Sequence, residues 1–367
     1  MKIFLIACHD AQSSRKIDFH FWADILADQG HRVYFITVGF SRISDIKKDT
    51  RRPARPYNQW LKIGTNYTKF SWMPYFHPCL NGLAKNRVVR KVFSLYPYQF
   101  PRSALAELKN ADLFIVESGA GLMLVPRLAK YCTNAKFLYS VSDRLKTLDA
   151  HPAILQGEAD ALPHFDAIRV PAAVMKNDFT PGLPVHHINP GLHKSLFDHA
   201  SDTPYTSPRN VVSVGDMLFD AKSIEIMAEH FPLWSFHLFG KGAKLTKKLP
   251  NVIEYGERPF FELVPYIQYA DIGLAPYKTA PSADYLSQSS LKMIQYTYCR
   301  LPILAPHFSA TGRPHVMLYR EGDRHSIIEA FKQAIIYDRK QIDRSQVLSW
   351  EEMIGRMLAL ITNKKYA

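Results

Sequence analysis

Apolar runs and segments of helical periodicity alternate from the first residues of the chain. Residues 2–7 form an apolar run that predicts a β-strand, and residues 32–38 form a second one. Residues 18–29, between these runs, have the periodicity of a helix that Gly30 ends. A strand, a helix and a strand in this order predict a parallel β-sheet, because parallel neighbours need a crossover connection.

The same alternation returns after residue 110 and predicts four more strands. They cover residues 111–117, 135–141, 165–170 and 185–188, with a helix to about residue 131 between the first two. Asp143 follows the second of these strands closely. Ligands bind at the carboxyl ends of strands in open α/β sheets, so this carboxylate is a candidate functional group. The alternative, which the local pattern favours, is that Asp143 caps the next helix.

A second series of strands and helices starts after a polar loop near residue 205. Its predicted strands cover 211–214, 235–239, 251–255 and 272–275, and its predicted helices cover 223–230 and 260–269. This restart predicts two Rossmann-like, doubly wound α/β domains that face each other across a cleft. We place the domains at residues 1–205 and 206–345. The pattern also indicates a last helix within residues 346–367, and one possibility we consider is that this helix crosses back to the first domain.

The stretch from Ala275 to Pro302 has the pattern of a phosphate site. A buried strand ends at Pro276, and a helix capped by Ser289 or Ser290 follows. The helix N-terminus offers free N–H groups and the positive end of its dipole, with Lys292 one step inside. The pattern therefore predicts a diphosphate site in the second domain, and the alternative is an ordinary capped helix.

The loop after the first strand carries polar residues but no GxGxxG motif. His9, Asp10, Arg15 and Lys16 lie at the carboxyl end of that strand, where substrates bind in open α/β sheets. The absence of the glycine pattern speaks against a dinucleotide-binding loop of the usual type. These four side chains are candidate substrate contacts, and the alternative is a solvated loop.

Composition describes a globular protein with room for two domains. The chain has 367 residues, of which 47% are hydrophobic and 22% are charged. No apolar run approaches the length of about 18 to 20 residues that a membrane-spanning helix needs. The four cysteines are far apart and form no CxxC pair, so the sequence predicts neither a zinc site nor a disulfide framework. A reducing cytoplasm fits this use of cysteine.

The net charge of +13 and the pI near 9.4 point to anionic partners. Between residues 50 and 106 the chain has no Asp or Glu, but it has ten Lys or Arg interleaved with aromatic residues. Residues 87–96 within this segment have an amphipathic pattern with a basic face. We expect the segment to dock on an anionic membrane surface. The alternatives are a helix packed on the sheet with a solvated basic face and a nucleic-acid-binding surface.

Seven short segments stand out by their order and spacing. They are HD at 9–10, VESG at 116–119, SD at 142–143, VGDMLFD at 214–220, YGE at 255–257, APY at 275–277 and YLSQSSLKMIQY at 285–296. Together they resemble the GumK-like glucuronosyltransferases of glycosyltransferase family 70, bacterial enzymes of xanthan assembly. The resemblance covers nearly the whole chain, and it implies the GT-B fold with two Rossmann-like domains.

The resemblance also implies a reaction and its residues. The reaction is inverting transfer of glucuronic acid from UDP-glucuronate to a lipid-diphosphate-linked oligosaccharide in exopolysaccharide synthesis, at the cytoplasmic face of the bacterial inner membrane. Asp143 takes the place of the general base. The positions that match the UDP-binding group are Met217, Glu257, Tyr277, Ser289, Ser290, Leu291, Lys292 and Gln295. Leu291 departs from the family's methionine, and no metal is implied, in agreement with the lack of an Asp-x-Asp motif.

Two other function classes compete with a transferase. A two-domain UDP-sugar epimerase would act on the free sugar nucleotide and ignore membranes. A basic nucleic-acid-binding protein would bind with a steep dependence on salt and no dependence on UDP. If the donor is a uronic acid, its carboxylate needs a cationic partner, and Arg15 or Lys16 is the candidate.

Overall fold

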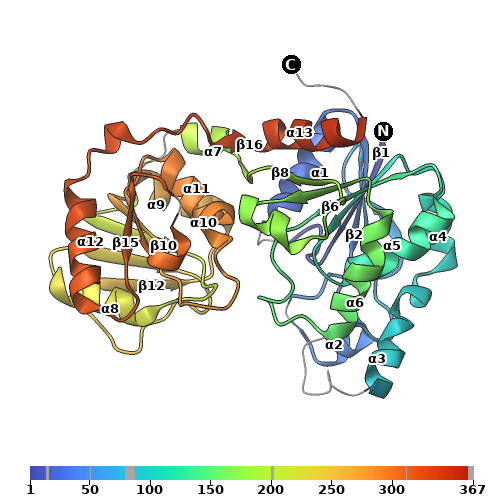
Figure 1. Ribbon diagram of the computed structural model, residues 1–367, viewed down its shortest axis with the longest axis horizontal. Coiled ribbons are helices and arrows are strands. Elements are labelled where there is room, and N and C mark those ends of the chain that lie inside the picture. The colour runs from blue at the N-terminus through green and yellow to red at the C-terminus, as the bar shows by residue number, and fades with distance from the viewer. Residues whose placement is uncertain (14–15, 50, 79–86, 200–201, 311, 363–367) are drawn as a thin grey trace. The chain divides into compact units, whose positions relative to one another are not determined.

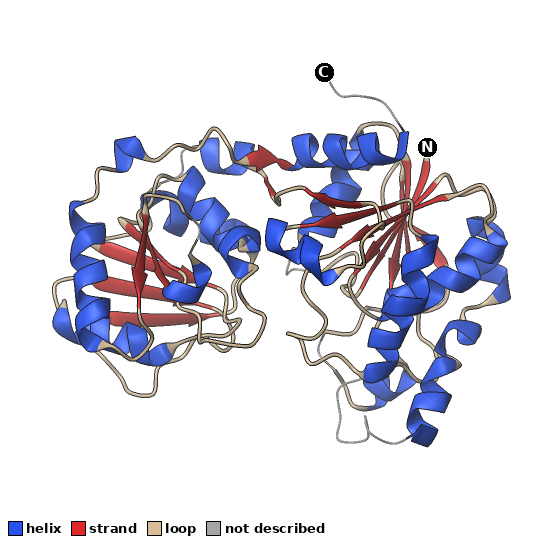
Figure 2. Ribbon diagram, in the orientation of Figure 1, coloured by secondary structure: helices blue, strands red, loops and turns tan. Residues whose placement is uncertain are grey.

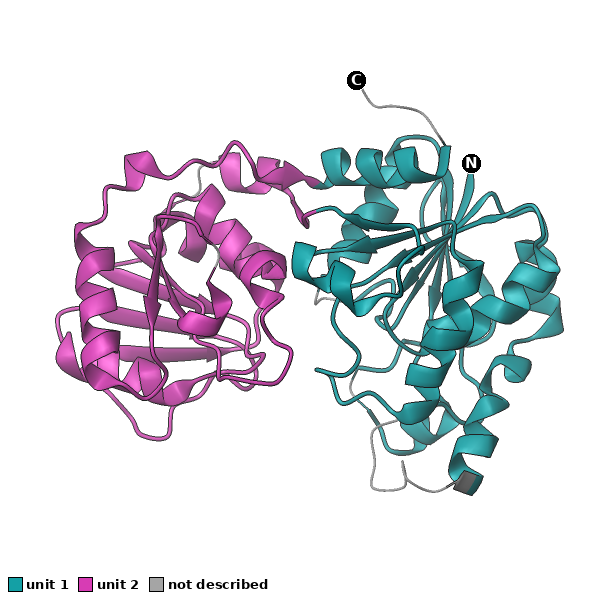
Figure 3. Cartoon of the chain, in the orientation of Figure 1, with its two compact units in different colours: residues 1–188, 350–367 teal, residues 189–349 magenta. Residues whose placement is uncertain are grey.

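The computed structural model describes residues 1–13, 16–49, 51–78, 87–199, 202–310 and 312–362 (Figure 1). The chain divides into two compact units, which Figure 3 shows in different colours. Unit 1 consists of Met1–Ile188 and Trp350–Ala367, and unit 2 consists of Asn189–Ser349. Each unit has one large β-sheet with helices packed around it (Figure 2).

The sheet of unit 1 has eight strands in the order β3-β4-β2-β1-β5-β6-β7-β8. The strands are β1 (Lys2–Ala7), β2 (Arg32–Thr37), β3 (Trp60–Lys62), β4 (Tyr67–Ser71), β5 (Leu113–Glu117), β6 (Lys136–Ser140), β7 (Ala167–Val170) and β8 (Val185–His187). The β3–β4 pair is antiparallel, and the other neighbours, such as β1 and β5, are parallel. Chain order reverses between β1 and β5, which is therefore the switch point of this doubly wound sheet.

A row of aromatic rings explains why the central strands align in this register. Phe4 of β1 pairs with Tyr34 of β2 and with Phe114 of β5, and Phe114 pairs with Phe137 of β6. The ring centroids of these three pairs are 4.7, 5.1 and 4.8 Å apart. Because a slip by one residue would turn every ring to the other face, the row stabilises a single register.

The helices of unit 1 include one that comes from the end of the chain. They are α1 (Asp18–Asp28), α2 (Arg42–Ile46), α3 (Arg87–Ser94), α4 (Arg102–Leu108), α5 (Val125–Tyr131), α6 (Pro152–Ala161) and α13 (Trp350–Thr362), with the 3₁₀ turns η1 (Tyr96–Gln99) and η2 (Ala120–Leu124) among the connections. Trp350 of α13 is 3% exposed and stacks on Phe21 of α1, with the ring centroids 5.7 Å apart. The last helix therefore completes the core of unit 1.

The main sheet of unit 2 has six parallel strands in the order β12-β11-β10-β13-β14-β15. They are β10 (Asn210–Val214), β11 (Ser235–Phe239), β12 (Val252–Gly256), β13 (Ile272–Leu274), β14 (Ile303–Pro306) and β15 (Val316–Tyr319). The helices are α7 (Lys194–Asp198), α8 (Ala221–His230), α9 (Phe260–Tyr269), α10 (Leu286–Ser289), α11 (Leu291–Tyr298) and α12 (Arg324–Ile336). Chain order reverses between β10 and β13, the position at which ligands bind in such sheets.

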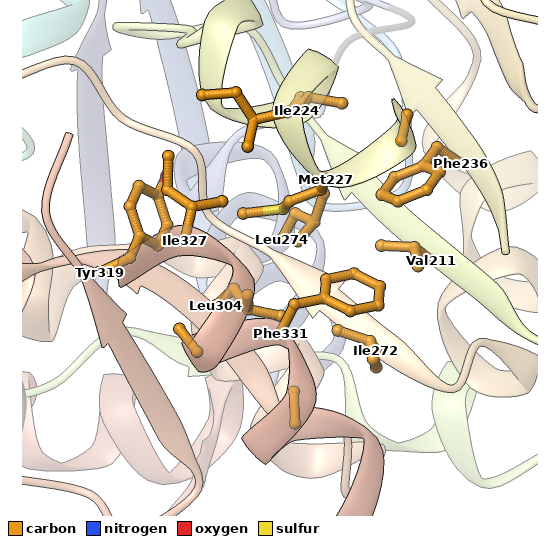
Figure 4. Close-up of a cluster of buried hydrophobic side chains, with 14 of the residues drawn as sticks. Val211, Ile224, Met227, Phe236, Ile272, Leu274, Leu304, Tyr319, Ile327 and Phe331 are labelled. Carbon is orange, nitrogen blue, oxygen red and sulfur yellow. The ribbon is translucent and has the colours of Figure 1, made fainter. Parts of the chain in front are cut away.

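Helices α8 and α12 cover one face of the unit 2 sheet and form its core with the strands (Figure 4). Met227 of α8 and Phe331 of α12 are fully buried there against strand residues such as Phe236. Phe331 stacks on Phe231, with the centroids 4.2 Å apart. The residues of this apolar core are different from the polar residues that follow the carboxyl ends of the strands.

The division into units differs from the sequence-based boundaries at residues 205 and 345. Residues 191–192 form β9, which pairs in parallel with β16 (Leu348–Ser349). Both short strands belong to unit 2, and α7 packs on α9 of the same unit. The sequence-based boundary at residue 205 assigned residues 189–205 to the first domain, but these contacts place the described part of this segment in unit 2. The predicted cleft between the domains stays a prediction.

Candidate functional site

In unit 2, three of the predicted residues come together after the carboxyl end of β13. The hydroxyl groups of Tyr277 and Ser290 are hydrogen-bonded, with their oxygens 2.6 Å apart. Nζ of Lys292 lies over the ring of Tyr277, 4.9 Å from its centroid. Tyr277 is 2% exposed and Ser290 is 6% exposed, so both hydroxyls have fixed positions. We call Tyr277, Ser290 and Lys292 the hydroxyl–lysine group.

Ser290, rather than Ser289, is the residue that caps α11. Its side chain accepts a hydrogen bond from the backbone N–H of Met293, at 3.4 Å. Ser289 is half-buried and ends the short helix α10 directly before it. Gln295 of α11 is 8% exposed, whereas Leu291 is 38% exposed, as its position in the first turn allows. The helix N-terminus and the hydroxyl–lysine group therefore occupy the same place, as an anion site requires.

A glycine directly after β10 lies beside the lysine side chain. Gly215 has a φ of +82°, and a Cβ on it would lie 3.8 Å from Nζ of Lys292. Asp216 follows, and its Oδ2 accepts a hydrogen bond of 2.6 Å from the N–H of Gly242. This bond joins the loop after β10 to the loop after β11. Sequence analysis did not single out Asp216, because its partner lies 26 residues away.

Burial lowers the pKa of Lys292 from 10.5 to about 8, and the negative charge of Asp216 opposes this shift. An ammonium group in a site that water hardly reaches gains more from an anionic ligand than an exposed one does. Lys292 is therefore suited to bind a phosphate group, because the ligand replaces the hydration that the lysine has lost.

Two other predicted donor contacts lie on the same edge of the sheet. Met217 is half-buried in the loop after β10, and Glu257 is exposed directly after β12. An isolated β-bridge between Phe219 and Tyr277 ties the β10 loop to the hydroxyl–lysine group. Glu257 follows a strand two positions from β10 in the sheet, so its inclusion in the site stays a prediction.

In unit 1, Asp143 lies in the loop after β6 and is half-buried. The prediction that it caps the next helix is wrong. The next helix, α6, begins at Pro152, and its cap is His151, which accepts a hydrogen bond from the N–H of Ala153 at 3.1 Å. Asp143 precedes a turn instead. Helix capping therefore does not explain why an aspartate stands at this position after the strand.

Asp143 belongs to a cluster of charged groups that the sequence did not reveal. Burial and the negative charges of Asp18 and Asp143 together raise the pKa of Glu117, at the end of β5, to about 8. Burial also raises the pKa of Asp18 to about 6, and the charge of Arg169 opposes this. Arg169 on β7 is 1% exposed and donates a hydrogen bond of 2.9 Å from Nε to the carbonyl oxygen of Ile188. Three carboxylates and one arginine from four segments thus meet near the strand ends of unit 1.

The predicted substrate contacts after β1 have structural partners of their own. Asp10 Oδ1 lies 4.0 Å from Nζ of Lys69, a residue of β4 that is only 3% exposed. The backbone oxygen of Asp10 is 2.7 Å from Nε2 of His20. His9 and Lys16 are half-buried, and Arg15 lies outside the described residues. The proposed contact between Arg15 or Lys16 and a donor carboxylate stays a prediction.

The basic segment of residues 50–106 contributes β3, β4, α3, η1 and α4 to unit 1, while residues 79–86 lie outside the described part. Val88, Val92, Leu95 and Tyr98 of α3 and η1 are between 41% and 72% exposed. A pocket of about 460 Å³ opens nearby and is lined by Arg102, Leu105, Arg127, Lys130 and Tyr131. The guanidinium of Arg127 lies 5.7 Å from the ring centroid of Tyr98, which joins the pocket to this apolar surface.

The described residues contain no group of three His, Cys, Asp or Glu side chains placed to hold a metal ion. Among them, no helix combines the length and the apolar character that crossing a membrane requires.

Comparison with known protein sequences supports the transferase interpretation over the alternatives. Residues 5–171 match the family described as glucuronosyltransferase GumK, N-terminal domain. The UDP-glucuronate:glycolipid 2-beta-glucuronosyltransferase of Xanthomonas campestris is 27% identical over 356 residues, which cover 96% of this chain and 88% of the relative. The putative teichuronic acid biosynthesis glycosyltransferase TuaH of Bacillus subtilis is 27% identical over 157 residues, 38% of this chain and 39% of TuaH.

Comparison with solved structures supports the fold. The structure of Anabaena HepE in complex with UDP and glucose has a TM-score of 0.62 at 12% identity, and it covers 99% of this chain and 100% of HepE. An alpha,alpha-trehalose-phosphate synthase from Burkholderia vietnamiensis has a TM-score of 0.57 at 11% identity, with 98% and 94% covered. Residues 5–171 therefore resemble the GumK N-terminal domain, and the chain as a whole has the GT-B fold and is similar to a glucuronosyltransferase.

Proposed function

We propose that this chain is an inverting glucuronosyltransferase that uses UDP-glucuronate and a lipid-diphosphate-linked oligosaccharide. The observation that carries the proposal is the hydroxyl–lysine group at the N-terminus of α11. It provides a half-buried cation, two hydroxyls and a helix N-terminus at one place, which is the chemistry that a nucleoside diphosphate needs. Similarity to a glucuronosyltransferase over 96% of the chain supports the choice of donor and reaction.

Unit 2 would bind the UDP part of the donor. When the bond between the anomeric carbon and the UDP oxygen breaks, negative charge builds up on the diphosphate. The ammonium group of Lys292 and the N–H groups of α11 would stabilise this charge in the transition state. We therefore propose a reaction that needs no metal ion.

Unit 1 would supply the base. In a single displacement, an acceptor hydroxyl oxygen attacks the anomeric carbon from the side opposite UDP, and its proton passes to a carboxylate. Asp143 is the best candidate, because it follows the end of a strand and caps no helix. The product would then have the β configuration, since the donor sugar is α-linked to UDP.

The acceptor would reach the enzyme at a membrane surface. Arg102, Arg127 and Lys130 converge on one pocket, whose lining includes no acidic side chain, and the exposed apolar residues of α3 and η1 lie beside it. Such a combination suits the anionic headgroups and the interface of a bilayer. We propose peripheral binding at the cytoplasmic face of the bacterial inner membrane.

Thermal shift with UDP, UDP-glucuronate, UDP-glucose and GDP, followed by a transfer assay with a lipid-linked acceptor, tests the proposal. We expect the uridine nucleotides to raise the melting temperature more than GDP, and UDP and a β-glucuronide to form only with acceptor present. Interconversion of free UDP-sugars without acceptor would indicate the epimerase instead. Salt-sensitive RNA binding without any response to UDP would indicate the nucleic-acid-binding class.

A further inference from the structure

A chain of hydrogen bonds connects the loop that carries Asp143 to a carboxylate on α6. The N–H of Ser142, the residue before Asp143, donates to Oγ of Ser118 at 3.1 Å. Oγ of Ser118 lies 3.3 Å from the hydroxyl oxygen of Tyr139, and this hydroxyl donates to Oε1 of Glu158 at 2.6 Å. We call Ser118, Tyr139 and Glu158 the hydroxyl chain.

The hydrogen bond that Tyr139 donates to Glu158 decides which way the other bonds in the chain point. A carboxylate only accepts hydrogen bonds, so the single proton of the Tyr139 hydroxyl is used on Glu158. The Tyr139 oxygen must then accept from the Ser118 hydroxyl, which leaves the Ser118 oxygen to accept from the N–H of Ser142. Each donor has one acceptor in this arrangement, and reversing any bond would leave a donor without one.

The chain is rigid because its members come from packed elements. Tyr139 is fully buried on β6, and its ring stacks on Phe165 with the centroids 5.2 Å apart. Ser118 directly follows β5 and is 9% exposed, and Glu158 lies on α6. Phenylalanine would fill the space of Tyr139 without burying a hydroxyl, so packing alone does not explain the tyrosine.

We infer that Ser118, Tyr139 and Glu158 are positioning residues that hold the Ser142–Asp143 backbone in the orientation in which Asp143 accepts the acceptor proton. None of the three needs to touch substrate. The inference rests on the proposed function, since it assigns Asp143 as the base. It adds that the rate of the chemical step depends on the hydroxyl of Tyr139, which lies on β6 and does not touch the reacting atoms.

Tyr139→Phe and Ser118→Ala test the inference, with Tyr96→Phe as the control. Tyr96 is also fully buried in unit 1, and its hydroxyl accepts a hydrogen bond of 3.4 Å from the N–H of Gly39 instead. We expect kcat to fall about tenfold in the two test variants, the effect of losing one hydrogen bond, with the KM for UDP-glucuronate unchanged. Amide hydrogen exchange at Ser142 should become faster in both variants, whereas Tyr96→Phe should leave kcat and this exchange rate unaltered.

A double mutant shows whether the chain acts through Asp143. Adding Tyr139→Phe to Asp143→Asn should cost no further activity, because the group being positioned has already lost its function. A further tenfold loss of activity in the double mutant, relative to Asp143→Asn alone, would overturn the inference. An unchanged kcat in Tyr139→Phe, together with faster amide exchange at Ser142, would overturn it as well. If Tyr139→Phe does not fold, Ser118→Ala answers the same question. Lack of any transfer by the wild-type protein would overturn the proposed function and the inference together, whereas the outcomes above overturn the inference alone.

Discussion

Lys292 is the residue on which donor binding should depend most. Its ammonium group lies over the Tyr277 ring and is largely withdrawn from water, so it gains from a phosphate what it lost in hydration. We expect Lys292→Ala to weaken UDP binding by roughly 10- to 100-fold, the range of one charge-assisted hydrogen bond. Calorimetric titration with UDP measures this, and Lys332→Ala, which removes an exposed lysine of α12, is the control. Equal UDP affinity in wild type and Lys292→Ala would remove Lys292 from the site.

The same lysine predicts how UDP affinity depends on pH. Because burial lowers its pKa to about 8, the ammonium form is complete well below this pH and is lost as the pH rises through it. UDP binds the ammonium form, so its dissociation constant should rise from about pH 7.5 to about pH 9.5 and approach a tenfold rise per pH unit. Titration in this range should show no such rise in Lys292→Ala. A flat profile in the wild type would contradict the assignment.

Asp143→Asn separates catalysis from structure, since asparagine keeps the shape of the side chain but cannot accept the proton. We expect the transfer rate to fall by about 10² to 10⁴ with UDP affinity unchanged, because the residue belongs to unit 1. Single-turnover transfer with UDP-glucuronate is the measurement. A rate near that of the wild type would assign the base to another residue, and an α-linked product would rule out the single displacement.

Local pattern made some of these residues predictable and hid others. Tyr277, Ser290 and Lys292 lie within 16 positions of one another on a strand end and a helix start, so the sequence predicts their meeting. Asp18, Glu117 and Arg169 come from α1, β5 and β7, and only the folded sheet brings their charges near Asp143. Asp18 has the pattern of an ordinary first helical residue, and Arg169 lies in an otherwise apolar strand, so neither gives a local signal.

Among the elements, the helices with a clear period and most of the apolar strands were predictable, including the short β8 and β13, whereas β4 was not. The predicted strand at 2–7 is β1, and the predicted helix at 18–29 is α1, which ends one residue earlier. Strand β4 was missed because Thr68 and Lys69 interrupt its apolar pattern. Lys69 is nevertheless buried, since its ammonium group donates to Gln12 Oε1 at 2.5 Å and lies near Asp10. Tertiary partners thus override the local polarity of this strand.

The pocket between α4 and α5 predicts which elements contact a membrane. Replacing Arg102, Arg127 and Lys130 by alanine should weaken binding to phosphatidylglycerol-containing vesicles about a hundredfold, since each cation near such a surface contributes about 1 kcal/mol. Cosedimentation at low salt measures this binding. Removing three exposed cations of unit 2, Lys222, Arg324 and Lys332, is the control and should have little effect. Equal binding to anionic and neutral vesicles would contradict the electrostatic account.

At the scale of the whole molecule, the chain leaves unit 1 at Ile188 and returns to it at Trp350. Strand β9 follows the first of these points in the chain and β16 precedes the second. The two strands pair in parallel, with Gly191 opposite Leu348. After the pair, α13 packs on α1 and β7 of unit 1. Helix α13 is therefore part of the core of the first unit, although the predicted donor-binding residues belong to the second. Stability of one unit and ligand binding by the other can be tested separately.

Trp350→Ala makes this separation measurable. Trp350 is 3% exposed and stacks on Phe21, so its removal should lower the free energy of unfolding of unit 1 by about 3 to 5 kcal/mol. Four of the five tryptophans, at 22, 60, 72 and 350, belong to unit 1, and the three that the variant retains still report its unfolding in urea by fluorescence. UDP affinity should stay at the wild-type value, because Tyr277, Ser290 and Lys292 all belong to unit 2. Glu351→Ala, an exposed change on the same helix, is the control and should affect neither quantity. A loss of UDP affinity in Trp350→Ala under conditions where unit 1 is still folded would show that α13 acts on the donor site and not only on the core.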